Sequence, residues 1–153
     1  LPPEKFPLKT DLGGLTAVVE AHPGHTPGDI VVRLPEQNIT LCGDLLFNGS
    51  YPVSFDADLP AWRRVLATFA SYGKDALFVP GHGPVCGQEG ISLLAGVFDD
   101  IAEQAEKLYR AGVPVEEARQ RYVVPERFAK LGMFSWNMTI GAAVASFYRS
   151  FSK

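Results

Sequence analysis

The three histidines of the sequence, His22, His25 and His82, are the side chains best suited to catalysis or metal binding. His25 and His82 lie in loops rich in glycine and proline, and each loop follows an apolar run that predicts a β-strand. Asp44 follows a third such run and a glycine. Loops at strand ends hold side chains in fixed positions, as metal binding and catalysis require. Two imidazoles and one carboxylate form a ligand set suited to zinc, manganese or iron.

Each of these residues also has a purely structural interpretation. A histidine in a turn is usually solvated or hydrogen-bonded to backbone, and Asp44 after a glycine could be a turn residue or a cap. Together, at the ends of three predicted strands, the three residues favour a metal site over these structural interpretations. His22 comes three residues before His25, but the proline and glycine between them break any helical register. We therefore expect His22 to be a loop or supporting residue rather than a ligand.

Other residues near these positions are assigned to packing and capping. Cys42 and Cys86 could bind a soft metal as thiolates, but their positions favour core packing. Asp58 precedes a predicted helix and is expected to cap it. Trp62 is expected in the core, and Tyr51 is a candidate for a substrate contact.

The chain reads as one domain over residues 1–153, with strands and metal-loop motifs in residues 1–87 and helices in residues 88–153. Residues 1–14 read as a lead-in segment rich in proline and glycine. Strands are predicted over residues 15–21, 30–34, 39–42 and 76–79, and helices over residues 59–72, 88–111, 114–122 and 137–151. Strands followed by helices indicate a mixed α/β or α+β layer fold.

Composition excludes several classes of protein. A net charge of −3 lacks the basic footprint of a nucleic-acid binder. No apolar run reaches the ~18 residues of a transmembrane helix, so we expect no membrane partner. Two cysteines cannot form a disulfide framework, and no signal peptide is visible. The compartment therefore stays open, with a preference for the cytoplasm.

Three motifs in order carry a resemblance to a known family: residues 24–29 (GHTPGD), 43–44 (GD) and 80–84 (PGHGP). In this order, at predicted strand ends, they resemble the metallo-β-lactamase superfamily, and within it the glyoxalase II-like and quinoprotein-associated metallohydrolases. The resemblance covers residues 15–85, and the helical remainder is compatible with it.

The resemblance implies an αββα sandwich, of which this chain would be the C-terminal half, and a site for one or two zinc ions. It implies that His25 binds the first metal, His82 the second, and that Asp44 bridges the two. A metal-bound hydroxide would then attack an ester, a thioester or a related centre of a small-molecule substrate. Iron or manganese would suit the same ligands.

The departure from the family is the absence of its main motif, His-x-His-x-Asp-His. A complete site would use five histidines and two aspartates, and this chain has three histidines in all. We therefore expect a fragment of a metal-dependent hydrolase that is inactive by itself and holds at most one metal, weakly. Two alternatives stay open: a degenerate, non-catalytic dimeric module of the same fold, or a site completed by another chain.

Half of a sandwich carries a sheet face that should pack against a second sheet. Left exposed, this face would form a larger apolar patch than monomers usually show. The sequence therefore predicts association, most simply a two-fold homodimer that places sheet on sheet.

Overall fold

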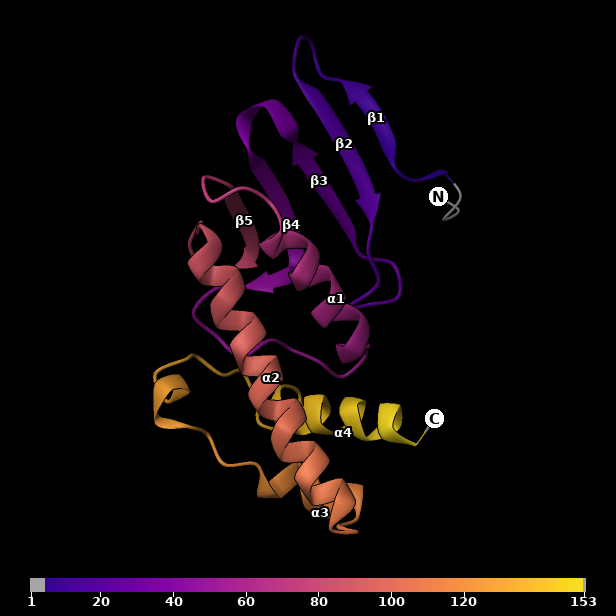
Figure 1. The fold of residues 1–153 in the computed structure, drawn as a ribbon, viewed down its shortest axis with the longest axis vertical. Helices are drawn as coiled ribbons and strands as arrows, with labels where there is room; N and C mark the ends of the chain where they lie inside the picture. Colours follow the sequence, from indigo (N-terminus) through magenta and orange to yellow (C-terminus); the bar gives the residue numbers. More distant parts are fainter. Residues whose placement is uncertain (1–4, 153) are drawn as a thin grey trace.

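The computed structural model describes residues 5–152, which form a five-stranded mixed sheet and four α-helices (Figure 1). The strands lie side by side in chain order: β1 (Leu8–Asp11), β2 (Thr16–Ala21), β3 (Ile30–Leu34), β4 (Ile39–Phe47) and β5 (Leu77–His82). Neighbouring strands are antiparallel, except that β4 and β5 run parallel. A parallel pair needs a crossover, which α1 (Leu59–Ala70) provides. The mixed α/β class predicted from the sequence is confirmed.

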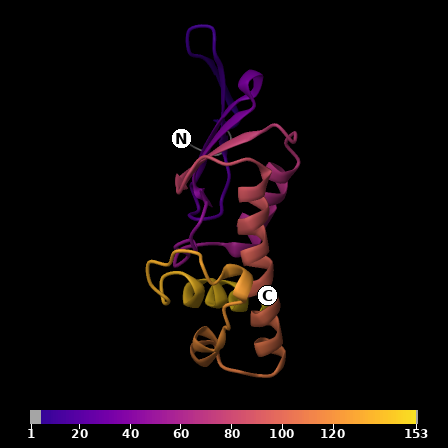
Figure 2. The same ribbon diagram turned by 90° about the vertical axis from the view of Figure 1, so that its left-hand side faces the viewer.

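Helix α1 and the long helix α2 (Gln88–Arg110) cover one face of the sheet. Asp58 caps α1 as predicted, since the backbone N–H of Ala61 donates to its Oδ1 at 2.9 Å. Phe69 of α1 packs on Phe78 of β5, with ring centroids 5.9 Å apart. Figure 2 shows that α1 and α2 lie on a single side of the sheet. Within residues 5–152, no helix combines the length and the apolar character needed to cross a bilayer.

The opposite face of the sheet is apolar and open. Strand register places Val19, Val32, Leu41 and Val79 in one row across this face. Four of its members are exposed by 40–48%: Leu8, Ile30, Leu41 and Leu77. The rows that share this face carry no charged side chain in the part of the chain that the structure describes. This is the kind of face expected for half of a sandwich.

Three strand predictions were wrong. The strand predicted over residues 76–79 continues to His82 as β5, so His82 ends a strand and does not lie in the loop after it. Residues 8–11 were predicted to belong to a lead-in segment, whose first four residues lie outside the described ones, but they form β1 at the edge of the sheet. The third predicted strand was expected to end at Gly43-Asp44, but β4 continues to Phe47. Gly43 adopts a φ of +54° at a register shift between β4 and β5, so it forms a bulge and not an end. Asp44 therefore lies within a strand.

The helical predictions over residues 59–72, 88–111 and 114–122 are confirmed to within two residues, as α1, α2 and α3 (Val115–Arg121). The last helix was predicted to begin near residue 137, but α4 spans Ile140–Phe151. The residues before it form a turn, in which the N–H of Thr139 donates to the carbonyl of Ser135 at 3.0 Å.

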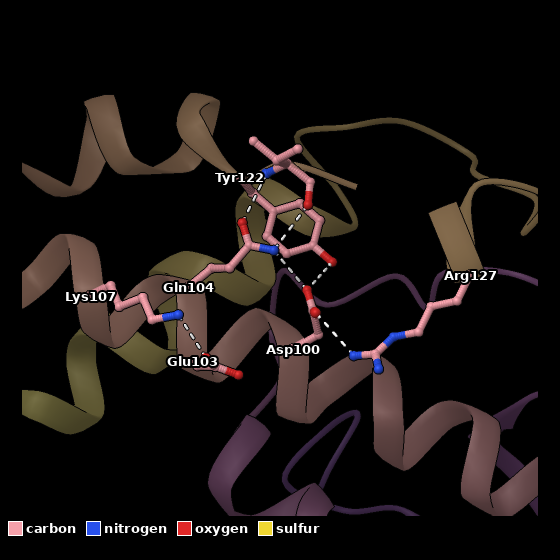
Figure 3. Close-up of polar contacts among 7 residues, drawn as sticks. Asp100, Glu103, Gln104, Lys107, Tyr122 and Arg127 are labelled. Carbon is pink, nitrogen blue, oxygen red and sulfur yellow. Dashed lines mark hydrogen bonds and ion pairs between the residues drawn. The ribbon is translucent and has the colours of Figure 1, made fainter. Parts of the chain in front are cut away.

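Asp100 of α2 anchors the segment that connects α3 to α4 (Figure 3). Its Oδ2 accepts from the Tyr122 hydroxyl at 2.9 Å and from Gln104 at 2.8 Å, and its Oδ1 accepts from Arg127 at 3.1 Å. Gln104 in turn exchanges two hydrogen bonds with the backbone of Val123. The Asp100 carboxylate is 13% exposed, so these partners take the place of water.

Replacing Asp100 by Ala should destabilise the fold by about 1–3 kcal/mol, because the Tyr122 hydroxyl and Gln104 lose a charged acceptor. The free energy of unfolding in urea measures this. Glu103 provides the matched control on the same helix: it pairs only with Lys107, and both side chains are about two-thirds exposed or more. Glu103→Ala should change the unfolding free energy by less than ~0.5 kcal/mol. Equal effects of the two substitutions would contradict this assignment.

Candidate metal centre

The parallel pairing of β4 and β5 brings Asp44, which lies inside β4, close to His82, the last residue of β5. The His82 Nε2 lies 3.5 Å from the Asp44 Oδ1. Both side chains are about 45% exposed, so both can reach a ligand from solvent. The two residues were predicted to lie in loops that follow strands, but Asp44 lies inside β4 and His82 is the last residue of β5. The carboxyl end of β5 points toward the side of the molecule that holds α4 (Figure 1).

Two glycines permit this approach. The Gly43 bulge lies beside Pro80 in the β4–β5 pairing and precedes Asp44 directly. Gly81 lies against Asp44: a Cβ at Gly81 would overlap the Asp44 Oδ1 and would lie 2.8 Å from the carbonyl carbon and oxygen of Gly43. Only a residue without a side chain leaves room for the carboxylate at this position.

His25 lies in the loop between β2 and β3. Figure 1 shows this loop at the same end of the sheet as the carboxyl end of β4. Asp29 closes this loop, because its carboxylate accepts from the N–H and the hydroxyl of Thr26, both at 2.8 Å. The His25 Nδ1 lies 3.9 Å from the Asp29 Oδ1. Trp62 packs edge-on against the His25 ring at 5.5 Å and donates its indole N–H to the Leu45 carbonyl at 2.8 Å. The imidazole is thus held by a buried scaffold while 18% of it stays exposed.

Phe47, the last residue of β4, contacts both histidines. Its ring is stacked on His82, with centroids 4.5 Å apart and planes 18° apart, and it lies 6.0 Å from His25. Phe134, from the connection between α3 and α4, meets His82 edge-on at 5.7 Å. The sequence did not reveal either aromatic contact, because Phe47 was expected in a loop and Phe134 lies far from His82 in the chain.

The surroundings of the other candidate residues indicate roles in packing rather than in metal binding. His22 faces Glu20 at 3.4 Å and contacts Phe69 edge-on. Cys42 is fully buried, and burial raises the pKa of its thiol to about 12. Burial also raises the pKa of the Cys86 thiol. Both cysteines therefore behave as small core residues. Tyr51, the candidate for a substrate contact, is only 1% exposed and lies in the core.

The donor set fits a zinc-type ion in its chemistry, but only in part in its arrangement. Asp44 and His82 offer a carboxylate oxygen and an imidazole nitrogen side by side. His25 shares the contact with Phe47. Among residues 5–152, however, no three His, Cys, Asp or Glu side chains lie close enough together to hold a metal. The described residues therefore hold no complete metal site by themselves.

A comparison with models of known protein families identifies the family of this chain. The model of the metallo-beta-lactamase superfamily matches residues 4–82, which is more than half of the chain. The chain belongs to the metallo-beta-lactamase superfamily. This matched region contains His25, Asp44 and His82, and it ends at His82.

Several solved structures are similar to parts or to most of this chain. A metallo-beta-lactamase from Pontibacter korlensis is 29% identical over 59% of this chain and 44% of its own, with a TM-score of 0.54. The metallo-beta-lactamase FIM-1 from Pseudomonas aeruginosa, in its mono-zinc form, is 32% identical over 60% of this chain and 42% of its own, with a TM-score of 0.50. A metallo-beta-lactamase family protein from Thermus thermophilus is 20% identical, covers 95% of this chain and 48% of its own, and has a TM-score of 0.68.

The chain thus spans less than half the length of these three structures. These matches single out no particular reaction and no branch of the superfamily.

Proposed function

We propose that these 153 residues are the C-terminal part of a metal-dependent hydrolase, and that His25, Asp44 and His82 supply part of its metal centre. The observation that carries this proposal is the Asp44–His82 pair on the neighbouring parallel strands β4 and β5, within the region that matches the superfamily model. The length of the matched structures supports further ligands outside these residues.

Zinc is the metal we propose, because one relative was solved in a mono-zinc form and imidazole and carboxylate suit this ion. A bound zinc ion would acidify water and stabilise negative charge on the oxygen of an ester, thioester or related substrate. The residues of this chain position the ligands: Phe47 fixes the His82 ring by stacking, and Gly81 leaves space for the Asp44 carboxylate. The chain alone should hydrolyse no such substrate, because it supplies at most three ligands.

Zinc binding by the 153-residue chain tests the ligand assignment directly. We expect weak binding of one zinc ion in a competition titration with a chromophoric chelator. Asp44→Asn and His82→Ala should each weaken this binding by about tenfold or more, because each removes a direct ligand. His22→Ala is the matched control and should bind zinc like the wild type, since His22 faces Glu20 and not the Asp44–His82 pair. Unchanged affinity in both ligand variants would refute the assignment.

The alternative is a non-catalytic module of the same fold. The absence of a three-ligand cluster among residues 5–152 favours it. A wild-type chain that binds no zinc at millimolar concentration would support this module over the hydrolase.

For the chain produced by itself, we also propose a partner: a second copy packed on the open sheet face. This face is apolar and uncharged in its described residues, so the same face of two copies can pack together around a two-fold axis. Four of its side chains, Leu8, Ile30, Leu41 and Leu77, are 40–48% exposed in the single chain. Burying them against the same face of another copy removes this apolar surface from water.

A further inference from the structure

The segment of residues 132–138, here called the Phe134 arm, packs beside the candidate metal centre. Gly132 pairs with Ser50, and the N–H of Tyr51 donates to the Gly132 carbonyl at 2.8 Å. At the other end of the arm, the N–H of Ser54 donates to the Met138 carbonyl at 2.7 Å. The arm thus runs along the loop that follows β4, the strand that carries Asp44.

The side chains of the arm are apolar and unusually exposed. Phe134 is 62% exposed although it contacts His82 edge-on at 5.7 Å. Met133 is 38% and Met138 43% exposed. Phe55, next to the residue that binds the arm at Met138, is 58% exposed. Exposed apolar side chains that follow one another along a short segment mark a binding surface, and Phe134 of this segment contacts the metal-ligand candidate His82.

We infer that the Phe134 arm is an apolar wall of the substrate site, which binds an alkyl or aryl group of a substrate whose reactive centre lies at Asp44 and His82. This inference rests on the proposed function and names its substrate class. An apolar group beside His82 would contact Phe134, and Met133 and Met138 lie on the same short segment. Methionine side chains are flexible and polarisable, so they adapt to apolar groups of different shapes.

The arm is held in place from α2 as well as from the β4–α1 loop. Asp100 binds Tyr122 and Arg127, which come before the arm in the connection from α3 (Figure 3). The side chains of the arm can therefore stay exposed without the backbone losing its position, which is what a preformed binding wall requires.

The methionines make the test specific, because Met133 and Met138 are the only two in the sequence. In the chain labelled with ¹³C at the methionine methyl groups, the spectrum has two signals, which Met133→Leu and Met138→Leu assign. Octanoate, a carboxylate with an alkyl chain, is titrated against acetate, which has the same head group without the chain. Octanoate should shift both signals in a saturable way and acetate should shift neither.

Phe134→Ala should weaken octanoate binding about fivefold or more, because an apolar contact surface is lost. Val123→Ala is the matched control: Val123 is 70% exposed and hydrogen-bonded to α2 through its backbone, so octanoate affinity should not change. Unshifted signals, equal shifts with acetate, or full affinity in Phe134→Ala would each overturn the inference. The methyl readout needs no zinc, so failure here with normal zinc binding counts against the arm alone. Loss of zinc binding with intact octanoate binding counts against the proposed function alone.

Discussion

Leu41→Lys is expected to convert the chain from a dimer to a monomer in sedimentation velocity at micromolar concentration. Leu41 lies in the middle of the open sheet face, paired with Val32 on one side and Val79 on the other. In a two-fold interface the substitution occurs twice, and each lysine would be buried without a partner. A buried unpaired charge costs several kcal/mol, so the dissociation constant should rise about a hundredfold or more.

The same substitution should leave the single chain folded, because Leu41 is already 40% exposed there and its backbone hydrogen bonds do not change. Far-UV circular dichroism checks this. Val123→Lys is the matched control, since Val123 is more exposed and lies off the sheet, and this variant should remain dimeric. A wild-type chain that sediments as a monomer, or that forms open-ended assemblies, would contradict the proposed partner. Contacts between two different surfaces can add further copies without limit, whereas contacts between two identical sheet faces form a closed dimer.

The sequence predicted the sheet well where apolar runs end at clear turns, and poorly where a glycine lies inside a strand. The strands predicted over residues 15–21 and 30–34 agree with β2 and β3 to within one residue. Gly43 looked like a strand end because glycine usually marks a turn. In the structure its positive φ makes a bulge, and the apolar residues after it continue β4. Strand β1 was missed because it has four residues, all exposed, between prolines and glycines.

The candidate metal ligands could be identified from the sequence, but the residues that surround them could not. Asp44 and His82 were named as candidates from the sequence, but the parallel pairing of β4 with β5, which brings them 3.5 Å apart, was not predicted. The contacts of Phe47 and Phe134 with His82 depend on tertiary packing between distant segments, which no local pattern encodes. The position of His25 relative to the other two depends on the fold of its loop around Asp29, and the motif alone does not fix it.

Gly81→Ala is expected to destabilise the fold by about 2–3 kcal/mol and to weaken zinc binding at the same time. The new Cβ would overlap the Asp44 carboxylate and press on the carbonyl group of Gly43. The second contact is with backbone inside the sheet, which cannot rotate away as a flexible side chain would. Relief therefore requires β4 and β5 to separate at the bulge, or Asp44 to leave its position 3.5 Å from His82.

Gly28→Ala separates this effect from the general consequence of replacing a loop glycine. Gly28 lies in the His25 loop, and a Cβ there would meet nothing within 4 Å. Its unfolding free energy in urea should stay within ~0.5 kcal/mol of the wild type, and its zinc affinity should be unchanged. If Gly81→Ala kept both values as well, the tight packing of Asp44 over Gly81 would not be what positions the carboxylate. If it lost stability but kept zinc affinity, Asp44 would not be a ligand, because displacing a ligand from its place beside His82 must weaken the binding of the ion that the two residues share.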